Sequence, residues 1–242
     1  MNKLDKRYTL FAFQVFGPFI ALWAVWQYVT LPLLVLSMSM FFLFRCIGSV
    51  ITFHRILGHK THKMYPVVEF ICTGLGYYGS LSSPIEFCAS HTLHHKYVDT
   101  CQDPHPYKLL GWKVMFPIFW NNSGPNGGDV RTVVRLMRNK SAMFFHQYYW
   151  YLLPLPLLLL LVSPQAFFFG YFIPMVATLW SLSLSTLNHD INEPKYMGVL
   201  FGILTCGEHH HEWHHNNPGN TTGEGWLNTI IEFITYRPKE RT

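Results

Sequence analysis

Four long runs of apolar residues alternate with short turns and with two polar segments. The runs cover residues 10–29, 33–53, 144–162 and 167–187. Each is about 20 residues long, so a helix over it would rise about 30 Å, the thickness of the hydrocarbon core of a bilayer. Thr30-Leu31-Pro32 and Ser163-Pro164-Gln165 separate consecutive runs and favour tight turns. The pattern therefore predicts four transmembrane helices.

The polar segments, residues 54–143 and 188–242, hold most of the charged residues. Both follow an even-numbered span, so they are expected on the same side of the membrane as the termini. Residues 67–83 are apolar but include Glu69 and several glycines, which favours a helix lying in the membrane interface. The whole chain is therefore predicted to be one all-α integral membrane domain, with four spans and a cap on one side.

Composition supports a membrane location. Half of the 242 residues are hydrophobic and only 13% are charged, too few to solvate a soluble protein of this size. Of the 18 basic residues, all but Arg45 fall on the side of the termini. The termini and the cap are therefore expected to be cytoplasmic, in an endoplasmic reticulum, bacterial or thylakoid-type membrane. The net charge of +5 reflects this topology, so nucleic acid is not an expected partner, and Arg45 is expected to have a structural partner inside the bundle.

Histidine is the other compositional outlier, with 14 residues, whereas the five cysteines show no CxxC spacing typical of a zinc site. Most of the histidines fall into three groups at the cap side: HRILGH (54–59), HTLHH (91–95) and HEWHH (211–215). On a helix, residues i, i+3 and i+4 share one face, so each HxxHH segment presents three imidazoles to one side. These groups are predicted to converge on a metal site.

Imidazole binds first-row transition metals such as iron, zinc and copper. The eight histidines of the three groups are too many for one ion, so we expect two ions, with His189 as a ninth ligand. His54 and His59 would lie about 140° apart on a straight α-helix, so the helix is expected to unwind near Gly58, or the pair to bracket the site. The remaining histidines are interpreted as surface or hydrogen-bonding residues: His62, His105, His146, His209 and His210. Because His209 and His210 adjoin the third group, they are also candidates for hydrogen bonds to the ligands.

These motifs resemble a known family. HRILGHK (54–60), EFCASHTLHHK (86–96), YVDTCQDPH (97–105) and GEHHHEWHH (207–215) are similar to the histidine boxes and the DPH segment of membrane-bound fatty acid desaturases, within them the acyl-CoA Δ9 desaturase type. The resemblance covers residues 40–235 and implies a four-helix membrane fold whose cytosolic cap holds two irons. It implies nine ligands: His54, His59, His91, His94, His95, His189, His211, His214 and His215.

Polar residues in and near these motifs are candidates for contacts behind the ligands or for a water ligand. Ser185 stands four residues before His189, where family members often have an asparagine that places a metal-bound water, and Asn188 is adjacent. Glu212 replaces the usual asparagine of the third box. The full set of these candidates is Ser185, Asn188, Asp99, Asp103, Glu208 and Glu212.

The resemblance implies an enzyme that inserts a cis double bond, at Δ9, into an acyl chain linked to CoA, acyl carrier protein or a membrane lipid. Breaking an unactivated C–H bond needs a redox metal that activates O2. Because the sequence has no dinucleotide fingerprint and no cytochrome b5 module, electrons are expected from a separate carrier such as cytochrome b5 or ferredoxin. The spans are expected to enclose the acyl tail. Phe41, Phe42 and Phe44 are candidates for the closed end of that tunnel, with lipid-facing packing as the alternative for each.

Two other functions are compatible with parts of the pattern. A related diiron hydroxylase or carotenoid ketolase shares the HxxHH boxes, but the DPH segment and the GExxHxxHH context favour desaturation. A metal transporter would need polar ligands along a route through the bilayer, and the four apolar runs contain few. The chemical nature of the product, an alkene rather than an alcohol or a ketone, would decide between the enzymes.

Overall fold

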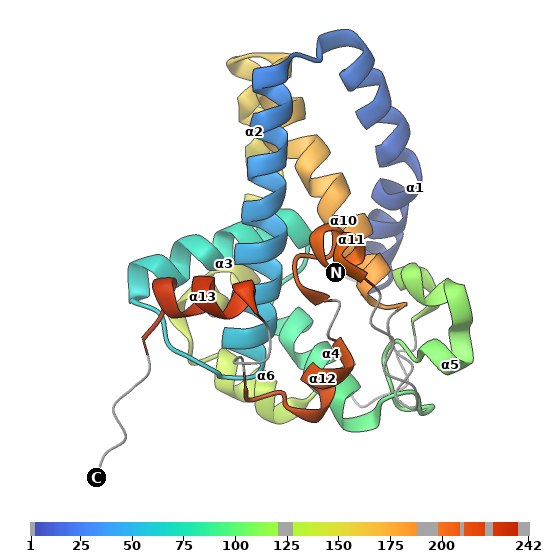
Figure 1. Ribbon diagram of the computed structural model, residues 1–242, viewed down its shortest axis with the longest axis vertical. Helices are drawn as coiled ribbons and strands as arrows, with labels where there is room; N and C mark the ends of the chain where they lie inside the picture. The colour runs from blue at the N-terminus through green and yellow to red at the C-terminus, as the bar shows by residue number, and fades with distance from the viewer. Residues whose placement is uncertain (1–2, 121–127, 188–197, 209–210, 221–224, 237–242) are drawn as a thin grey trace.

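Three long helices project from a broader cap of short helices (Figure 1). The structure is a computed structural model that describes residues 3–120, 128–187, 198–208, 211–220 and 225–236, with the backbone alone for 3–5 and 211–213. The first long helix is α1 (Lys3–Tyr28), and the second runs from α2 (Leu31–Phe42) directly into η1 (Leu43–Gly58). The third combines α9 (Pro164–Phe167), η6 (Phe168–Phe172) and α10 (Ile173–Ser185). Each is long and apolar enough to cross a membrane, as predicted from residues 10–29, 33–53 and 167–187.

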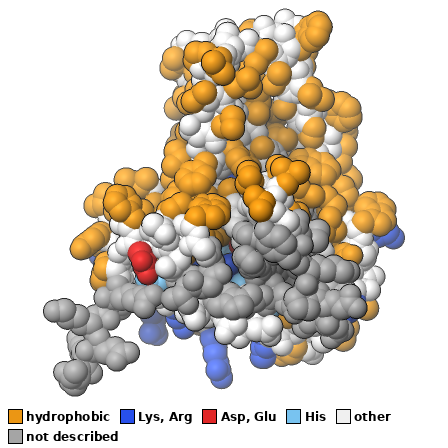
Figure 2. All heavy atoms as spheres, viewed as in Figure 1, with side chains coloured by type: hydrophobic (Ala, Val, Ile, Leu, Met, Phe, Trp, Pro, Cys, Tyr) orange, Lys and Arg blue, Asp and Glu red, His pale blue; other side chains and the backbone are white. Residues whose placement is uncertain are grey.

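The outer surfaces of these helices are apolar. Leu22, Trp26, Leu31 and Met38 are 67%, 84%, 75% and 71% exposed, and Figure 2 shows hydrophobic side chains covering this end of the molecule. Lys and Arg side chains instead gather at the opposite edge of the cap. A continuous apolar surface of this extent is unusual in soluble proteins, and it fits a membrane protein.

The prediction of one continuous helix over residues 144–162 is wrong. This segment is divided among α7 (Lys140–Gln147), α8 (Tyr149–Leu152) and the 3₁₀ helix η5 (Leu155–Leu161). Pro154 and Pro156 lack an amide proton, so a regular α-helix cannot continue through them. The apolar part, Tyr149–Leu161, is shorter than the three long helices. A fourth membrane crossing therefore stays a prediction.

The cap consists of short helices around the end of η1. In chain order they are α3 (Pro66–Ser80), α4 (Pro84–Tyr97), α5 (Tyr107–Leu110), η2 (Gly111–Met115), η3 (Pro117–Phe119), α6 (Val130–Leu136), α11 (Gly198–Leu204), α12 (His211–Asn216) and α13 (Trp226–Ile234). In the part of the chain that is described, β-type pairing is confined to one isolated bridge, between Lys63 and Tyr236. The fold is therefore all-helical, as predicted.

A close helix contact fixes α3 against η1. A Cβ atom added at Gly48 would lie 2.6 Å from Gly76 Cα, so the two backbones can approach this closely only because both residues are glycine. The opposite face of α3 is apolar and exposed, with Val67 and Ile71 at 71% and 57%. This two-faced helix is the element predicted for the membrane interface at residues 67–83.

Candidate metal centre

The first histidine pair lies on an unusually wide helix. In η1 the backbone hydrogen bonds connect residues five apart, and the bond from His59 N to His54 O, at 3.1 Å, continues this pattern at the end of the helix. Residues i and i+5 are neighbours along such a π-helix, whereas on an α-helix they diverge. The imidazole rings of His54 and His59 therefore lie 5.2 Å apart, and the unwinding expected near Gly58 extends through the whole of η1.

The second histidine segment lies on α4, which starts with Pro84 in its first turn. Cys88 Sγ donates to Phe53 O at 3.1 Å, which fixes α4 beside the end of η1. His91 and His95 lie one helical turn apart and face the first pair, with 4.1 Å between the ring centroids of His54 and His91 and 4.5 Å between those of His59 and His95. The ring of His94 instead lies beside Asp103 and His105, so the three rings of this HxxHH segment belong to two separate groups.

Five imidazoles from three separate segments converge. One ring nitrogen from each of His54, His59, His91, His95 and His214 lies within 4.8 Å of the others, and we call this set the five-histidine cluster. The Nε2 atom of His214 lies 2.7 Å from that of His54 and 3.1 Å from that of His59. The Nε2 atoms of His59 and His91 are 2.9 Å apart. His214 belongs to the third box, on α12.

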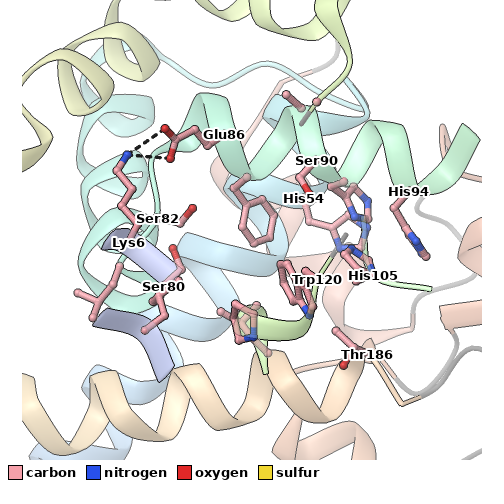
Figure 3. A pocket seen from close by; sticks show the side chains of 18 of the residues that line it. Lys6, His54, Ser80, Ser82, Glu86, Ser90, His94, His105, Trp120 and Thr186 are labelled. Carbon is pink, nitrogen blue, oxygen red and sulfur yellow. Dashed lines mark hydrogen bonds and ion pairs between the residues drawn. The ribbon is translucent and has the colours of Figure 1, made fainter. Parts of the chain in front are cut away.

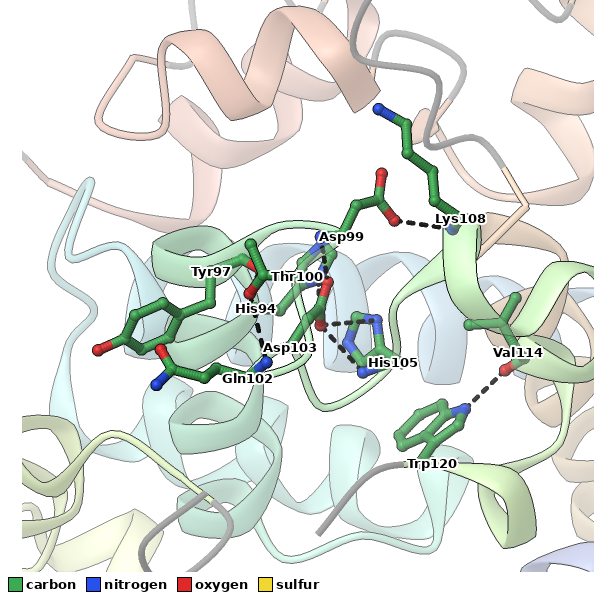
Figure 4. A network of polar contacts seen from close by, with 10 residues as sticks. All are labelled: His94, Tyr97, Asp99, Thr100, Gln102, Asp103, His105, Lys108, Val114 and Trp120. Carbon is green, nitrogen blue, oxygen red and sulfur yellow. Dashed lines mark hydrogen bonds and ion pairs between the residues drawn. The ribbon is translucent and has the colours of Figure 1, made fainter. Parts of the chain in front are cut away.

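Carboxylates stand behind two of the histidines. Glu208 Oε1 lies 3.2 Å from His54 Nδ1, and Asp103 Oδ1 lies 2.8 Å from His94 Nδ1 (Figure 4). Glu208 and Asp103 are 2% and 0% exposed. A buried carboxylate at Nδ1 fixes the imidazole tautomer and directs the lone pair of Nε2 away from it, which is the usual arrangement behind a metal-bound histidine.

The surroundings keep His91 neutral. Burial, followed by the neighbouring His54, His95, His59 and His215, lowers the pKa of His91 well below its ordinary value of 6.5. A neutral imidazole offers the lone pair that a metal ion needs. The pKa of Asp103 is raised to about 7 by burial, against the opposing effect of the backbone N–H groups of His105 and Asp99.

A second group of potential ligands lies next to the first. His94, Asp103 and His105 offer ligand atoms within 4.8 Å of one another, and all three residues are buried. The His215 ring lies 5.0 Å from His94 and stacks on His95 at 4.1 Å, so it lies between the two groups. The interpretation of His105 as an ordinary surface or hydrogen-bonding residue missed this position. Its ring stacks on His94 at 4.1 Å because the DPH turn folds back under α4, and the DPH motif itself was the available signal.

The first group fits a metal ion by its donor chemistry and spacing. Nitrogen ligands about 2.1 Å from one ion lie about 3 Å apart in octahedral geometry, close to the Nε2 separations in the five-histidine cluster. Metal-binding imidazoles need a deprotonated ring nitrogen, and in this group the buried Glu208 holds the opposite nitrogen of His54. Several predicted residues lie outside the described side chains: His189, Asn188, His211 and Glu212, together with His209 and His210.

Two further candidates have other partners in the structure. Ser185 Oγ accepts from Arg45 Nη2 at 2.6 Å and donates to Ser181 O at 3.1 Å, so its proton is directed along its own helix. Asp99 accepts from Lys108 N at 3.0 Å and supports the turn that carries Asp103 (Figure 4). The roles of Ser185 and Asp99 at a metal therefore stay predictions.

A cavity of about 480 Å³ leads away from the histidines. Figure 3 shows His54, His94 and His105 at one end, Trp120 in between, and the Lys6–Glu86 ion pair at the other end. Both carboxylate oxygens of Glu86 accept from Lys6 Nζ at 2.9 Å. Apolar side chains line the intervening walls: Leu10, Leu81, Ile85, Phe87, Leu179 and Leu182. A cavity of this size and apolar lining suits a small hydrophobic molecule.

The three phenylalanines predicted to close the tunnel are not among the described residues of the cavity wall. Phe42 is 38% exposed and stacks on Trp226, with 6.5 Å between the ring centroids. Phe41 packs against a different apolar cluster, formed by η1, α3 and α13. Phe44 is buried in the same apolar cluster as Leu81 and Leu179, which do line the cavity, so of the three phenylalanines it alone belongs to the packing that supports the wall.

No family model matches the chain. It is 25% identical over 186 residues to an sn-1 stearoyl-lipid 9-desaturase of Synechocystis sp., a match that covers 70% of this chain and 56% of the relative. A protein of the same name from Anabaena variabilis is 24% identical over 186 residues, covering 70% and 66%. An acyl-CoA C20 Delta5-desaturase of Anemone leveillei is 34% identical over 58 residues, covering 24% and 19%.

The matched segments thus span less than two thirds of the length of each of these relatives. The relatives act on different acyl carriers and bond positions according to their names, and what they share is desaturation of a fatty acyl chain. At low identity, these similarities support a fatty acid desaturase family, a class of oxidoreductases, for this chain.

Proposed function

We propose that this protein is a fatty acyl desaturase that uses two irons and O2 to insert a cis double bond, at Δ9, into a saturated acyl chain. The observation that carries the proposal is the convergence of five imidazoles from three distant segments at the end of an apolar cavity. Removing hydrogen from an unactivated alkyl chain requires oxidation, and two bound irons would supply the O2 activation for it. Acyl chain, O2, two electrons and two protons give the alkene and two waters.

The residues divide into ligands and supports. The five-histidine cluster would hold one iron. His94 and His215 would contribute to the second, with His189 and His211 as the remaining proposed ligands. Glu208 and Asp103 fix the rings of His54 and His94 by accepting from Nδ1. This preorganisation keeps the nitrogen lone pairs directed at the metal positions before any ion is bound.

The cavity would bind the acyl chain. Its apolar walls exclude water, and each methylene of the acyl chain that they bury would stabilise the bound substrate by about 0.8 kcal/mol. Lys6, Glu86 and His146 line the far end and would lie near the polar end of the substrate, whether that is CoA, acyl carrier protein or a lipid. The electrons would come from a separate donor such as cytochrome b5 or ferredoxin, approaching from the cytoplasmic side.

In this proposal the three long helices and the broken segment 149–161 cross the membrane, so that the termini, the cap and the irons share the cytoplasmic side. The prolines make the fourth crossing irregular, and η5 has no buried residue, so its exposed leucines would face the lipid in this arrangement. A multi-pass arrangement of this kind would put the metal centre at the membrane surface and the acyl tail within the bilayer depth.

Expression in a host that lacks the activity tests this function. Fatty-acid profiling should show a new monounsaturated product whose bond position and chain length can be read directly. His54→Ala and His95→Ala should abolish it, whereas His62→Ala, which changes a buried histidine outside the cluster, should retain it. An alcohol or ketone product would instead identify the related hydroxylase or ketolase reaction. Absence of any product together with absence of bound iron would reject the proposal.

A further inference from the structure

We propose that Arg45 is a positioning residue for the candidate metal centre, because its guanidinium joins the chain segments that lead to the first histidine pair, to His189 and to the third box. The inference rests on the proposed function, since it concerns the same centre. Arg45 is 2% exposed, in the middle of the second long helix and nine residues before His54.

Two hydrogen bonds connect Arg45 to the third long helix. Its Nε donates to Ser181 Oγ at 2.8 Å, and its Nη2 donates to Ser185 Oγ at 2.6 Å. Both serines are on α10, and Ser185 stands four residues before His189 in the sequence. Arg45 thus fixes η1, which carries the first histidine pair, against the helix that leads to the lone histidine.

The serines extend the connection to the third box. Ser181 Oγ donates its proton to Leu204 O at 2.6 Å, and Ser185 Oγ donates to Ser181 O at 3.1 Å. Each hydroxyl therefore turns a lone pair toward the guanidinium. Leu204 ends α11 and precedes Glu208 by four residues, and Glu208 contacts His54.

The energetic cost of this arginine argues for a specific role. A cation within a membrane-spanning helix is expensive, and in the part of the chain that is described no carboxylate oxygen lies within 4.0 Å of this guanidinium. Its partners at short range are neutral hydroxyls, and the attraction of Glu208 acts at longer range. Well-packed apolar residues stabilise a core at least as well as buried charges do, so packing alone does not account for the arginine. The planar guanidinium instead fixes two acceptors at a defined angle.

The test is metal affinity of the full-length protein in detergent. Co²⁺ is titrated in competition with a chromophoric chelator, and its visible absorption reports the ligand geometry. Arg45→Met should weaken Co²⁺ binding about 10-fold, the lower end of the range for residues that hydrogen-bond a ligand directly, because Arg45 acts on the ligands through the segments that carry them. Arg45→Lys keeps the charge but has one nitrogen for two acceptors, so it should give a smaller loss with an altered spectrum.

Two controls separate positioning from general destabilisation. Ser39→Ala changes an exposed serine of the same long helix, and it should bind Co²⁺ like the wild type. Tyr77→Phe removes the buried bond from Tyr77 Oη to Tyr149 O, 2.5 Å long, which involves no histidine. It should lower the thermal stability of the metal-free protein and leave Co²⁺ affinity within about twofold.

The proposal is overturned if Arg45→Met binds Co²⁺ within about twofold of the wild type, or if Tyr77→Phe loses as much affinity as Arg45→Met. A wild-type protein that binds Co²⁺ but makes no desaturated product would reject the proposed reaction and leave the positioning role to be judged by these affinities. A wild-type protein that binds no metal would reject both.

Discussion

Asp103 accepts a hydrogen bond from His94 Nδ1 with both of its carboxylate oxygens, at 2.8 and 2.9 Å. The same carboxylate accepts from the backbone N–H groups of Asp99 and His105. One buried side chain therefore sets the shape of the DPH turn and the orientation of a histidine on α4. This relationship links a loop with no ligand in the five-histidine cluster to the candidate second metal position.

Asp103→Asn should weaken metal binding about 10- to 100-fold, because a neutral amide accepts less strongly from the His94 imidazole. Iron content after dialysis against a chelator measures the effect. Asp129→Asn is the matched control: Asp129 caps α6 by accepting from Thr132 N at 2.8 Å, and asparagine caps a helix equally well. Equal iron retention in the two variants would contradict the role of Asp103.

Glu208→Gln should lower the free energy of unfolding by about 3 kcal/mol, because it leaves the buried Arg55, whose guanidinium lies 3.6 Å from Glu208, without that opposite charge. Chemical unfolding in detergent, followed by circular dichroism, gives the difference. Glu232→Gln changes an exposed glutamate on α13 and should stay within about 0.5 kcal/mol of the wild type. A loss in Glu208→Gln no larger than that of the control would show that Glu208 does not compensate Arg55.

Gly48→Ala should destabilise the protein by about 1–3 kcal/mol, because the added methyl group would overlap the backbone of α3 at Gly76. Gly170→Ala places the same methyl where nothing lies within 4 Å, and alanine favours a helix over glycine by about 1 kcal/mol. Thermal unfolding of the two variants should thus move in opposite directions. A similar shift in both would mean that the contact between η1 and α3 can relax.

Phe44→Leu should lengthen the preferred acyl chain, because Phe44 belongs to the apolar cluster that supports Leu81 and Leu179 in the cavity wall and a smaller side chain lets that wall recede. Phe42→Leu changes a side chain stacked on Trp226, away from the cavity, and should leave chain length unchanged. The chain-length distribution of the unsaturated products measures both. The same distribution from both variants would remove Phe44 as a determinant.

Phe233 is 89% exposed on α13, whose Leu227 and Ile231 are buried, so this helix presents an apolar residue outward. With the exposed Cys101 replaced by serine, a fluorophore on Phe233→Cys should be quenched by brominated lipids if α13 lies in the membrane interface. Cys101 is the only exposed cysteine and lies in the turn after α4, so the same fluorophore there should respond to aqueous iodide instead. Quenching by iodide at both positions would place α13 in water.

The sequence was sufficient to predict the three long helices and the meeting of the histidine groups, because both depend on periodicity that survives without tertiary detail. The division of HTLHH was not predictable: His91 and His95 face the five-histidine cluster, whereas His94 faces Asp103, a contact nine residues away in sequence. The broken segment at 144–162 was predictable from Pro154 and Pro156, but the strongly apolar composition was given more weight than these two prolines. The partners of Arg45 and the pairing of Lys6 with Glu86 join residues 136, 140 and 80 positions apart, beyond the reach of local patterns.

The π-helical hydrogen bonding of η1 has a consequence for variation in this chain. Removing one residue between Leu43 and Phe53 would turn the preceding part of the helix by roughly a quarter of a turn relative to His54, in addition to shortening it. Side chains that now face lipid would then point at neighbouring helices, and Arg45 would leave its serines. The number of residues in η1 therefore sets the rotation, about the helix axis, between the exposed apolar face of this helix and the imidazoles at its end. Substitutions in η1 should for this reason be far better tolerated than single-residue insertions or deletions.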